Sequence, residues 1–585
     1  MRISIRPSSK KSDSIYIIKD LYLRDVRGKK SAGKPSGKDR TTVTVANLGK
    51  IPDLMASMNM TRDEVIAWAK EEAKRMTEKE KKDNERVSID YFPNLRIEKD
   101  VLRHFNCGYL FLQSLYYELR MDNVCRNISS RHDFKYSLDS ILSDLIYARV
   151  LEPCSKRASY KYCQALLEPP KYQEHDVYRA LSVLAEENDY IQSEVYKNSN
   201  FVLKRNNRIL YYDCTNYYFE IEEEDEFRKY GKSKENRPNP IVQMGLFMDG
   251  NGIPLAFDLF EGNQNEQPSM KPLEKKILSD FGVKRFVVCT DAGLSSAPNR
   301  ILNNTADRRF VTTQSIKKLK GFLKDFCLSD EGWHLSGSPG SFKLSELDEN
   351  DHYDKTFYKD RWIKEDGLEQ HLIVTFSFKY RDYQRSIRSR QLERAAKLTD
   401  NPSALKKNRQ NDPRRFVRQD HCTSDGEAAD KVITSIDEDV VREEERYDGF
   451  YAVCTNLEDD ISTIISINQR RWQIEECFRI MKSEFRARPV YLSRKDRITA
   501  HFITCFTALI IYRILEKKLD KGYTCDSIIR TLKEMDMMVL PGEGYIPEYT
   551  RTDLTDQLHD AFGFRTDYEI ISQRNMKKIL TATRK

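Results

Sequence analysis

The sequence predicts an α/β protein in which a mixed sheet flanked by helices is interrupted by a β-rich insertion and preceded by a mainly helical region. Residues 208–314 alternate strand-like and helix-like runs in a β-β-β-α-β-α-β series, which is typical of such a sheet. Residues 61–200 have helical periodicity instead. Short strand-like runs surround a very basic stretch between residues 320 and 450, which indicates a separate insertion.

Composition limits the possible classes of protein. The chain has 585 residues, enough for three to four domains of about 150 residues each. Its 39% hydrophobic and 32% charged residues favour a soluble protein. Lys and Arg number 98 against 91 Asp and Glu, so the net charge of +7 alone indicates a polyanionic partner only weakly.

Twelve cysteines without CxxC pairs or zinc spacing, and the lack of an apolar leader, predict a cytoplasmic protein with reduced thiols. The most apolar run, residues 502–515, is too short to span a bilayer and is predicted to be a buried helix.

The elements follow in order along the chain. Residues 1–50 are predicted to form a small β element, because YIIKDLYL and TTVTVANLG alternate like strands. A helical region, 51–205, comes next, and its helix from residue 61 opens with Thr61 and Glu64 at capping-box spacing. The first part of the sheet domain covers 206–320, the β-rich insertion 321–448 and the second part 449–520. Residues 521–585 are expected to form a polar C-terminal tail region.

Three carboxylates have contexts that suit metal chemistry. Asp213 lies inside an apolar and aromatic strand, where an unpaired charge is costly. Asp291 ends the strand-like run FVVCTD, where side chains reach the carboxyl edge of a sheet. Glu475 shares one predicted helix face with Arg471 and Lys482. Carboxylate oxygens suit Mg²⁺ or Mn²⁺. The alternatives are turn residues for the two Asp and an Arg471 salt bridge for Glu475.

The segment from residue 468 to 482 resembles the YREK signature of DDE-type insertion-sequence transposases. That signature has Tyr, two residues, Arg, three residues, Glu, six residues and Lys, and Arg471, Glu475 and Lys482 fit it. Asn468 stands where the family has Tyr, which puts the phosphate contact of that Tyr in doubt. The segments YDCTNYYFE, GLFMDGNGIPLAFDLFEGN, CTDAGLSSAPN and DGFYAVCTN also look like family blocks. The resemblance covers about 208–515 well and the helical N-terminal region loosely.

The resemblance implies a ribonuclease-H-like catalytic core with the β-rich insertion of this branch. Asp213, Asp291 and Glu475 would hold two Mg²⁺ or Mn²⁺ ions, and Arg471 and Lys482, with Asn468 beside them, would contact DNA near the scissile phosphate. Residues 51–205 would bind DNA or dimerise. The reaction would be metal-dependent cleavage at transposon ends followed by strand transfer into target DNA, by a homodimer on double-stranded DNA.

The insertion adds further candidates. The basic stretch 381–419 is either a solvated loop or a surface that follows the DNA backbone. Its candidate DNA-binding residues are Arg388, Arg390, Lys406, Lys407, Arg414 and Arg415. In relatives an insertion-domain Trp stacks on a flipped base; Trp333 and Trp362 are the candidates here, with core packing as the alternative. Trp472 is predicted to anchor the Glu475 helix in the core.

Other functions compete with transposition. A ribonuclease-H-like nuclease or resolvase would use the same carboxylates without strand transfer. A domesticated transposase that only binds DNA would be expected to have lost an acid, and all three are present. A glycosidase with two carboxylates leaves the Arg471–Lys482 pair unexplained.

Overall fold

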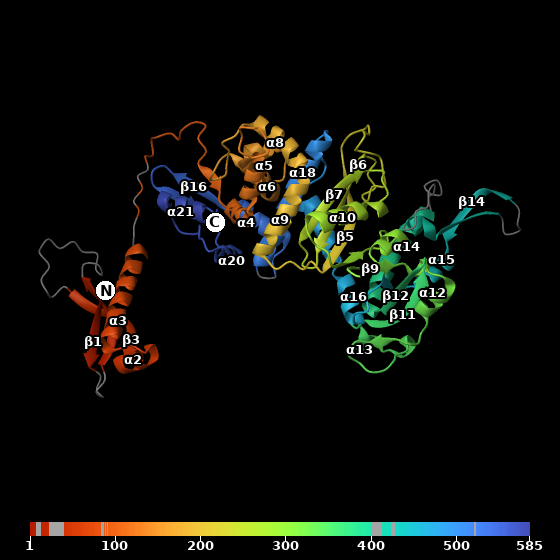
Figure 1. The fold of residues 1–585 in the computed structure, drawn as a ribbon, viewed down its shortest axis with the longest axis horizontal. Coiled ribbons are helices and arrows are strands. Elements are labelled where there is room, and N and C mark those ends of the chain that lie inside the picture. Colours follow the sequence, from red (N-terminus) through yellow and green to blue (C-terminus); the bar gives the residue numbers. More distant parts are fainter. Residues whose placement is uncertain are drawn as a thin grey trace. The chain divides into compact units, whose positions relative to one another are not determined.

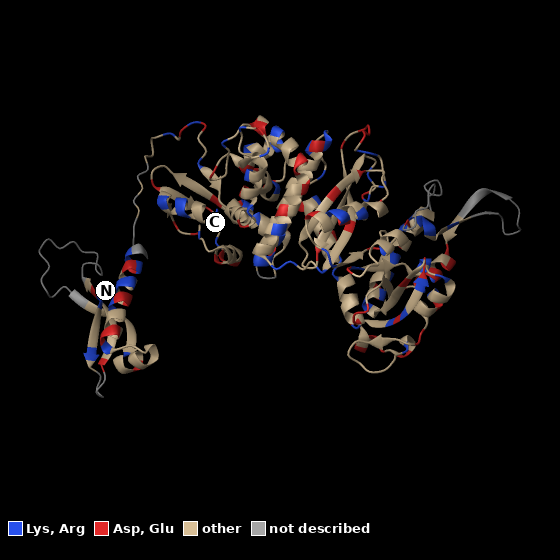
Figure 2. Cartoon of the chain, in the orientation of Figure 1, with Lys and Arg blue, Asp and Glu red and all other residues tan. Residues whose placement is uncertain are grey.

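The computed structural model describes residues 1–7, 13–22, 40–83, 87, 89, 92–399, 412–422, 428–519 and 522–585. These residues form two compact units, 1–99 and 100–585, and Figure 1 shows the elements of each. Basic and acidic residues are interspersed over both units (Figure 2), in keeping with the small net charge.

The first unit is a small antiparallel sheet with two helices. Its strands, in the order β1-β2-β3, are β1 (Arg2–Pro7), β2 (Asp13–Tyr22) and β3 (Arg40–Lys50). Helices α2 (Ile51–Met58) and α3 (Arg62–Asp83) follow, and Val65 and Ala69 of α3 are buried with Ile15 and Ile51. The predicted capping box is present, because the Glu64 carboxylate accepts the Thr61 backbone N–H at 2.7 Å.

A helical layer opens the second unit. It contains β4 (His104–Asn106), α4 (Tyr109–Glu118), α5 (Met121–Ser129), α6 (Leu138–Leu151), α7 (Lys156–Cys163), α8 (Glu174–Glu186) and α9 (Asn188–Val202). Helix α18 (Lys495–Lys518) packs against α4, α6, α8 and α9 (Figure 1). This helix is long and apolar enough to cross a membrane, but 94% of its most apolar window is buried inside the structure. It is therefore the central core helix, as the sequence predicted.

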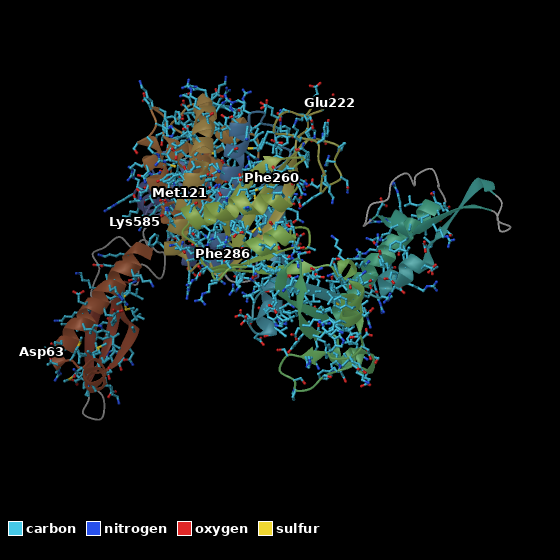
Figure 3. The ribbon with its side chains drawn as sticks, turned by 45° about the vertical axis from the view of Figure 1, so that its right-hand side comes forward. Asp63, Met121, Glu222, Phe260, Phe286 and Lys585 are labelled. Atoms are coloured by element: carbon cyan, nitrogen blue, oxygen red, sulfur yellow. The ribbon has the colours of Figure 1, made fainter. Side chains whose placement is uncertain are left out.

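The main sheet has the strand order β10-β11-β12-β15-β9-β8-β5-β6-β7. Its central strands are β5 (Ile209–Tyr218), β6 (Ile241–Asp249), β7 (Pro254–Glu261), β8 (Phe286–Thr290), β9 (Arg308–Gln314) and β15 (Phe450–Thr455). β5 and β9 each run parallel to β8, and the other neighbours are antiparallel. Helices α10 (Met270–Asp280) and α11 (Ala297–Leu302) connect them. This is the predicted ribonuclease-H-like mixed sheet, and Figure 3 labels Phe260 and Phe286 on two of its strands.

Between β9 and β15 the chain widens this same sheet. It adds α12 (Gly321–Leu328), β10 (His334–Leu335), α13 (Glu349–His352), β11 (Phe357–Glu365) and β12 (Leu368–Phe376), and β12 pairs with β15. The first part of the basic stretch, up to residue 399, then lies in a 22-residue helix, α14 (Phe378–Thr399), where a solvated loop was one of our two interpretations. Its Arg, Gln, Leu and Ala residues favour helix, and it contains neither Gly nor Pro. The hairpin of β13 (Val417–Cys422) and β14 (Ala428–Ile436) and helix α15 (Glu438–Glu445) complete the segment.

After β15 come α16 (Ile461–Gln469), α17 (Trp472–Arg479) and a π-helical turn (Ile480–Glu484), where we predicted one continuous helix. The region expected as a polar tail is folded. It contains α19 (Cys525–Glu534), β16 (Asp536–Leu540), β17 (Gly544–Pro547), α20 (Asp553–Phe562), β18 (Ile571–Ser572) and α21 (Gln573–Ala582). Strand β16 pairs with β4, so this region completes a second sheet with the start of the helical layer.

Candidate active site

The two predicted Asp residues come from neighbouring strands of the sheet. Asp213 lies in β5, and Asp291 directly follows the end of β8. The parallel pairing of these strands runs as far as Tyr211 with Cys289, and the two carboxyls are close enough for the charge of Asp291 to raise the pKa of Asp213. Tyr211 and Cys289 face the core that contains α16 and α17, and since side chains alternate along a strand, Asp213 faces the same way.

Glu475 comes to this edge of the sheet on α17. Ile474, Cys477 and Phe478 are buried and fix the inner face of the helix. The hydroxyl of Tyr211 on β5 donates to the Ile467 carbonyl of α16 at 2.9 Å, which ties the helix pair to the strand of Asp213. The Glu475 side chain is 56% exposed and lies on the solvent side of the helix.

Arg471 lies among the three carboxylates. Its guanidinium is 2.9 Å from the Glu475 carboxylate and 3.9 Å from that of Asp213. The pKa of Arg471 is raised above its ordinary value: burial lowers it, but the negative charges of Glu475, Asp213 and Asp291 outweigh burial. The salt bridge that we gave as the alternative for Glu475 is thus present, and it extends to Asp213.

Asp213 carries the most perturbed carboxyl of the site. Burial raises its pKa to about 6, and the like charge of Asp291 adds to that rise, while Lys234 and Arg471 oppose it. Its side chain is 14% exposed. A carboxylate that is buried beside a second carboxylate is a place where a bound cation relieves both desolvation and repulsion.

Lys482 lies on the π-helical turn and also faces this site. Its Nζ is 3.1 Å from the Glu235 carboxylate and 5.5 Å from the centre of the Tyr217 ring. Burial and the nearby Lys234 lower its pKa to about 8, and Asp213 opposes that shift. Sequence reasoning missed Lys234 and Glu235, because they lie on the loop between β5 and β6 and only the fold brings them here.

The structure shows what surrounds Asn468. Its side chain is buried, and its amide donates to the hydroxyl of Tyr451 at 3.0 Å. Tyr451 comes from β15, and its hydroxyl also lies 2.6 Å from that of Thr313. A tyrosine hydroxyl from strand β15 is therefore present beside the position of the signature Tyr, which lies on α16.

A cavity of about 700 Å³ adjoins Glu475 and Arg471. Aromatic side chains from three elements line it: Tyr380 and Tyr383 of α14, Tyr451 of β15 and Trp472 of α17. Trp472 is 56% exposed, so our prediction of a core anchor was wrong. The buried stripe of α17 runs through Ile474 and Cys477, and Trp472 lies off that stripe.

The two insertion tryptophans differ in environment. Trp333 is fully buried, with the ammonium of Lys359 4.2 Å from its ring centre, which is the core role that we gave as the alternative. Trp362 is 43% exposed and stacks on His371 at a centroid distance of 4.9 Å.

The basic candidates of the insertion fall into distinct environments. Arg388 is buried and binds both Asp448 carboxylate oxygens at 2.6 Å, an arrangement that suits a structural role. Arg415 is paired with Glu444 at 2.8 Å. Arg390 is exposed on α14, and Arg414 lies 3.9 Å from Asp412. Lys406 and Lys407 lie outside the described residues.

The three acids can be compared with the ligands that a divalent metal ion needs. Asp213, Asp291 and Glu475 offer carboxylate oxygens, the ligands that Mg²⁺ and Mn²⁺ prefer. In the part of the chain that the structure describes, no three His, Cys, Asp or Glu side chains are grouped closely enough to hold a metal ion as they stand. Glu475 pairs with Arg471 instead, and its side chain is 56% exposed. The three residues therefore fit the ion in donor type, and Glu475 would have to exchange Arg471 for the ion.

Comparison with known proteins defines the class. The family model "Transposase DDE domain" matches residues 208–511, more than half of the chain. The chain belongs to this DDE transposase family. Among solved structures, the piggyBac transposase synaptic complex with hairpin DNA matches with a TM-score of 0.34 and 10% identity, covering 81% of this chain and 88% of that one. No curated protein matches the chain.

Proposed function

We propose that the protein cuts double-stranded DNA at the ends of a transposable element and joins the freed 3′ ends to target DNA. The observation that carries this proposal is that Arg471 contacts both Asp213 and Glu475, while the charge of Asp291 acts on Asp213. Membership of the DDE transposase family supports the transposase class.

In this proposal Asp213, Asp291 and Glu475 hold two divalent metal ions, Mg²⁺ or Mn²⁺. Bound there, the ions would supply an acidified water and stabilise the charge on the leaving oxygen. Asp213 lies in β5 and Asp291 directly follows β8, while Glu475 lies on the exposed face of α17 and would exchange its Arg471 partner for an ion.

The cations of the site have a complementary role. Arg471 and Lys482 would bind phosphate oxygens of the strand being cut, since an Arg fork suits two oxygens and a Lys one. Both now pair with carboxylates, Arg471 with Glu475 and Lys482 with Glu235. DNA would exchange these pairs for phosphate contacts.

The aromatic cavity beside Glu475 supports a nucleic-acid substrate. Trp472 and Tyr383 are both more than half exposed and line it. Exposed aromatic rings next to cations are suited to base stacking. Of the insertion cations, exposed Arg390 is the best candidate for the DNA backbone, and a homodimer on DNA follows from the same proposal.

The test is a Mg²⁺-dependent assay of cleavage and joining with DNA that carries the element's own ends. Asp213→Asn, Asp291→Asn and Glu475→Gln should each reduce cleavage by at least about a hundredfold. Glu476→Gln is the matched control, because Glu476 is the next residue on the same helix but pairs with Arg513 at 3.3 Å; it should cut at close to the wild-type rate.

The same assay separates the alternatives. Cleaved ends without joined product would favour a nuclease or resolvase. Retention of full cleavage and joining by any one of the three variants would refute the role of that residue.

A further inference from the structure

A second cavity, of about 400 Å³, lies between the helical layer and the segment that follows the Glu475 helix. Five basic residues line it: Arg149, Lys156, Arg486, Arg488 and Arg497. None of the described residues that line it is acidic. A cavity with this lining has a strongly positive potential, which favours an anion.

The two most buried cations of this cavity have N–H donors without a partner. Lys156 is 5% exposed, and its ammonium has no hydrogen-bond partner in the structure. Arg149 is 3% exposed; its two terminal nitrogens donate to the carbonyls of Phe485 and Cys154, each at 3.1 Å, and its Nε has no partner. A buried charge without a partner costs several kcal/mol, so such a group in a native protein calls for a ligand.

Arg497 of α18 also has an unused donor in this cavity. Its Nε has no partner, while its guanidinium lies 5.3 Å from the centre of the Tyr178 ring. Neighbouring Asp496 pairs with Arg494 at 2.7 Å, and Glu235 pairs with Arg488 of this cavity and with Lys482. The cavity is thus lined by unused N–H donors from α6, α7 and α18.

Titration of the lining residues agrees with this geometry. Burial and the charge of Arg149 lower the pKa of Lys156 to about 7. Burial, Arg149 and Lys156 hold the pKa of His501 well below its ordinary value, so this imidazole is neutral and adds no charge.

We propose that this cavity is a phosphate-binding site, in which Lys156, Arg149 and Arg497 bind the oxygens of one phosphate group. Several convergent cationic donors suit a tetrahedral, multiply charged oxyanion better than a monovalent one. The phosphate comes either from the DNA backbone or from free phosphate in solution. Glu235, which binds both Arg488 of this cavity and Lys482 of the active site, places the two sites next to each other.

The experiment uses the full chain in chloride buffer and has two arms. In the first, inorganic phosphate is titrated calorimetrically into wild type, Lys156→Met, Arg497→Gln and the control Arg494→Gln. Arg494 lies three residues from Arg497 but pairs with Asp496 and does not line the cavity. Wild type and the control should bind phosphate, and both cavity variants should bind it at least about tenfold more weakly.

In the second arm, affinity for double-stranded DNA is measured across a salt series. If the cavity takes a backbone phosphate, Lys156→Met lowers the slope of log affinity against log salt by about one. If the slope of log DNA affinity against log salt stays unchanged while the cavity variants lose phosphate binding, the site binds free phosphate.

The stability of Lys156→Met provides an independent check. In phosphate-free buffer its melting temperature should equal or exceed that of wild type, because an unpaired buried ammonium is removed. If Lys156→Met fails to fold, both the phosphate titration and the DNA salt series are done with Arg497→Gln.

The proposal is overturned if wild type binds no phosphate and no cavity variant changes the DNA salt slope, or if both variants bind phosphate like wild type. The second arm rests on the proposed function and the first does not. A chain that binds phosphate but neither binds nor cuts DNA would refute the proposed function alone.

Discussion

The guanidinium of Arg471 lies 2.9 Å from the carboxylate of Glu475 and 3.9 Å from that of Asp213, so one cation joins helix α17 to strand β5. Two acids that a metal site would use are thus held next to each other by a side chain of the same signature. This contact makes Arg471 both a structural link in the free protein and a DNA ligand in the proposed complex.

Arg471→Gln should therefore impair two measurable properties. Loss of the cation removes a charge that lowers the pKa of Asp213, so that pKa should rise above about 6. The salt dependence of DNA affinity should weaken by about one unit of slope, and the cleavage rate should fall by about ten- to a thousandfold. Arg471→Lys keeps the positive charge but loses the forked guanidinium. It should therefore restore the salt dependence of DNA affinity more fully than the cleavage rate. A Gln variant with wild-type slope and rate would contradict both roles.

Asp249→Asn should destabilise the second unit strongly. Asp249 forms a fully buried ion pair with Arg205, whose guanidinium also donates to the Ser199 hydroxyl at 2.7 Å and the Pro254 carbonyl at 2.9 Å. Removal of one partner leaves an uncompensated buried charge, at a cost of about 3–5 kcal/mol.

Urea unfolding monitored by tryptophan fluorescence measures this loss. The control is Asp439→Asn, whose partner Arg442 is 72% exposed in its side chain, and it should change stability by less than about 1 kcal/mol. If Asp249→Asn and Asp439→Asn lowered the free energy of unfolding equally, the Asp249–Arg205 pair would not have the stabilising role proposed for it.

The stability of the helical layer should depend on pH through Asp144. This residue is 8% exposed and accepts a hydrogen bond from Tyr172 at 2.8 Å, and burial raises its pKa to about 7 from an ordinary value of 3.8. The folded state therefore binds the proton more tightly than the unfolded state. Its contribution to stability is fully present below pH 3.8 and is lost as the pH rises through 7.

Asp144→Asn keeps an acceptor for Tyr172 without the titration. Its stability relative to wild type should increase between pH 5 and pH 8 by about 1–3 kcal/mol, as urea unfolding at the two pH values would show. The exposed Asp560→Asn serves as the control. A difference between wild type and Asp144→Asn that does not vary with pH would refute the assignment.

Local pattern was enough to predict the central sheet. Strands β5 to β9 are runs of β-branched and aromatic residues, and such runs persist as strands because both faces are buried. The spacing of Arg471 and Glu475 and the order of the sequence blocks led to the three acids, whose catalytic role stays a prediction.

Features that depend on tertiary contact could not be predicted. Lys234 and Tyr451 reach the site from a loop and from a distant strand, and no spacing in the sequence links them to Arg471. Helix α14 lacks a clear apolar stripe, since only Phe378, Arg388 and Ala395 are buried, so periodicity did not reveal it. The cationic cavity at Lys156 combines residues more than 300 positions apart.

The central claim, that Asp213, Asp291 and Glu475 form one metal site, is tested most directly by Mn²⁺ binding to the DNA-free chain, followed by electron paramagnetic resonance. Wild type and Glu476→Gln should bind Mn²⁺ with the same affinity. Asp213→Asn and Asp291→Asn should each weaken binding by at least about tenfold, and Glu475→Gln should weaken it less, because Glu475 is held by Arg471. Equal Mn²⁺ affinity in wild type, Asp213→Asn and Asp291→Asn would contradict the account.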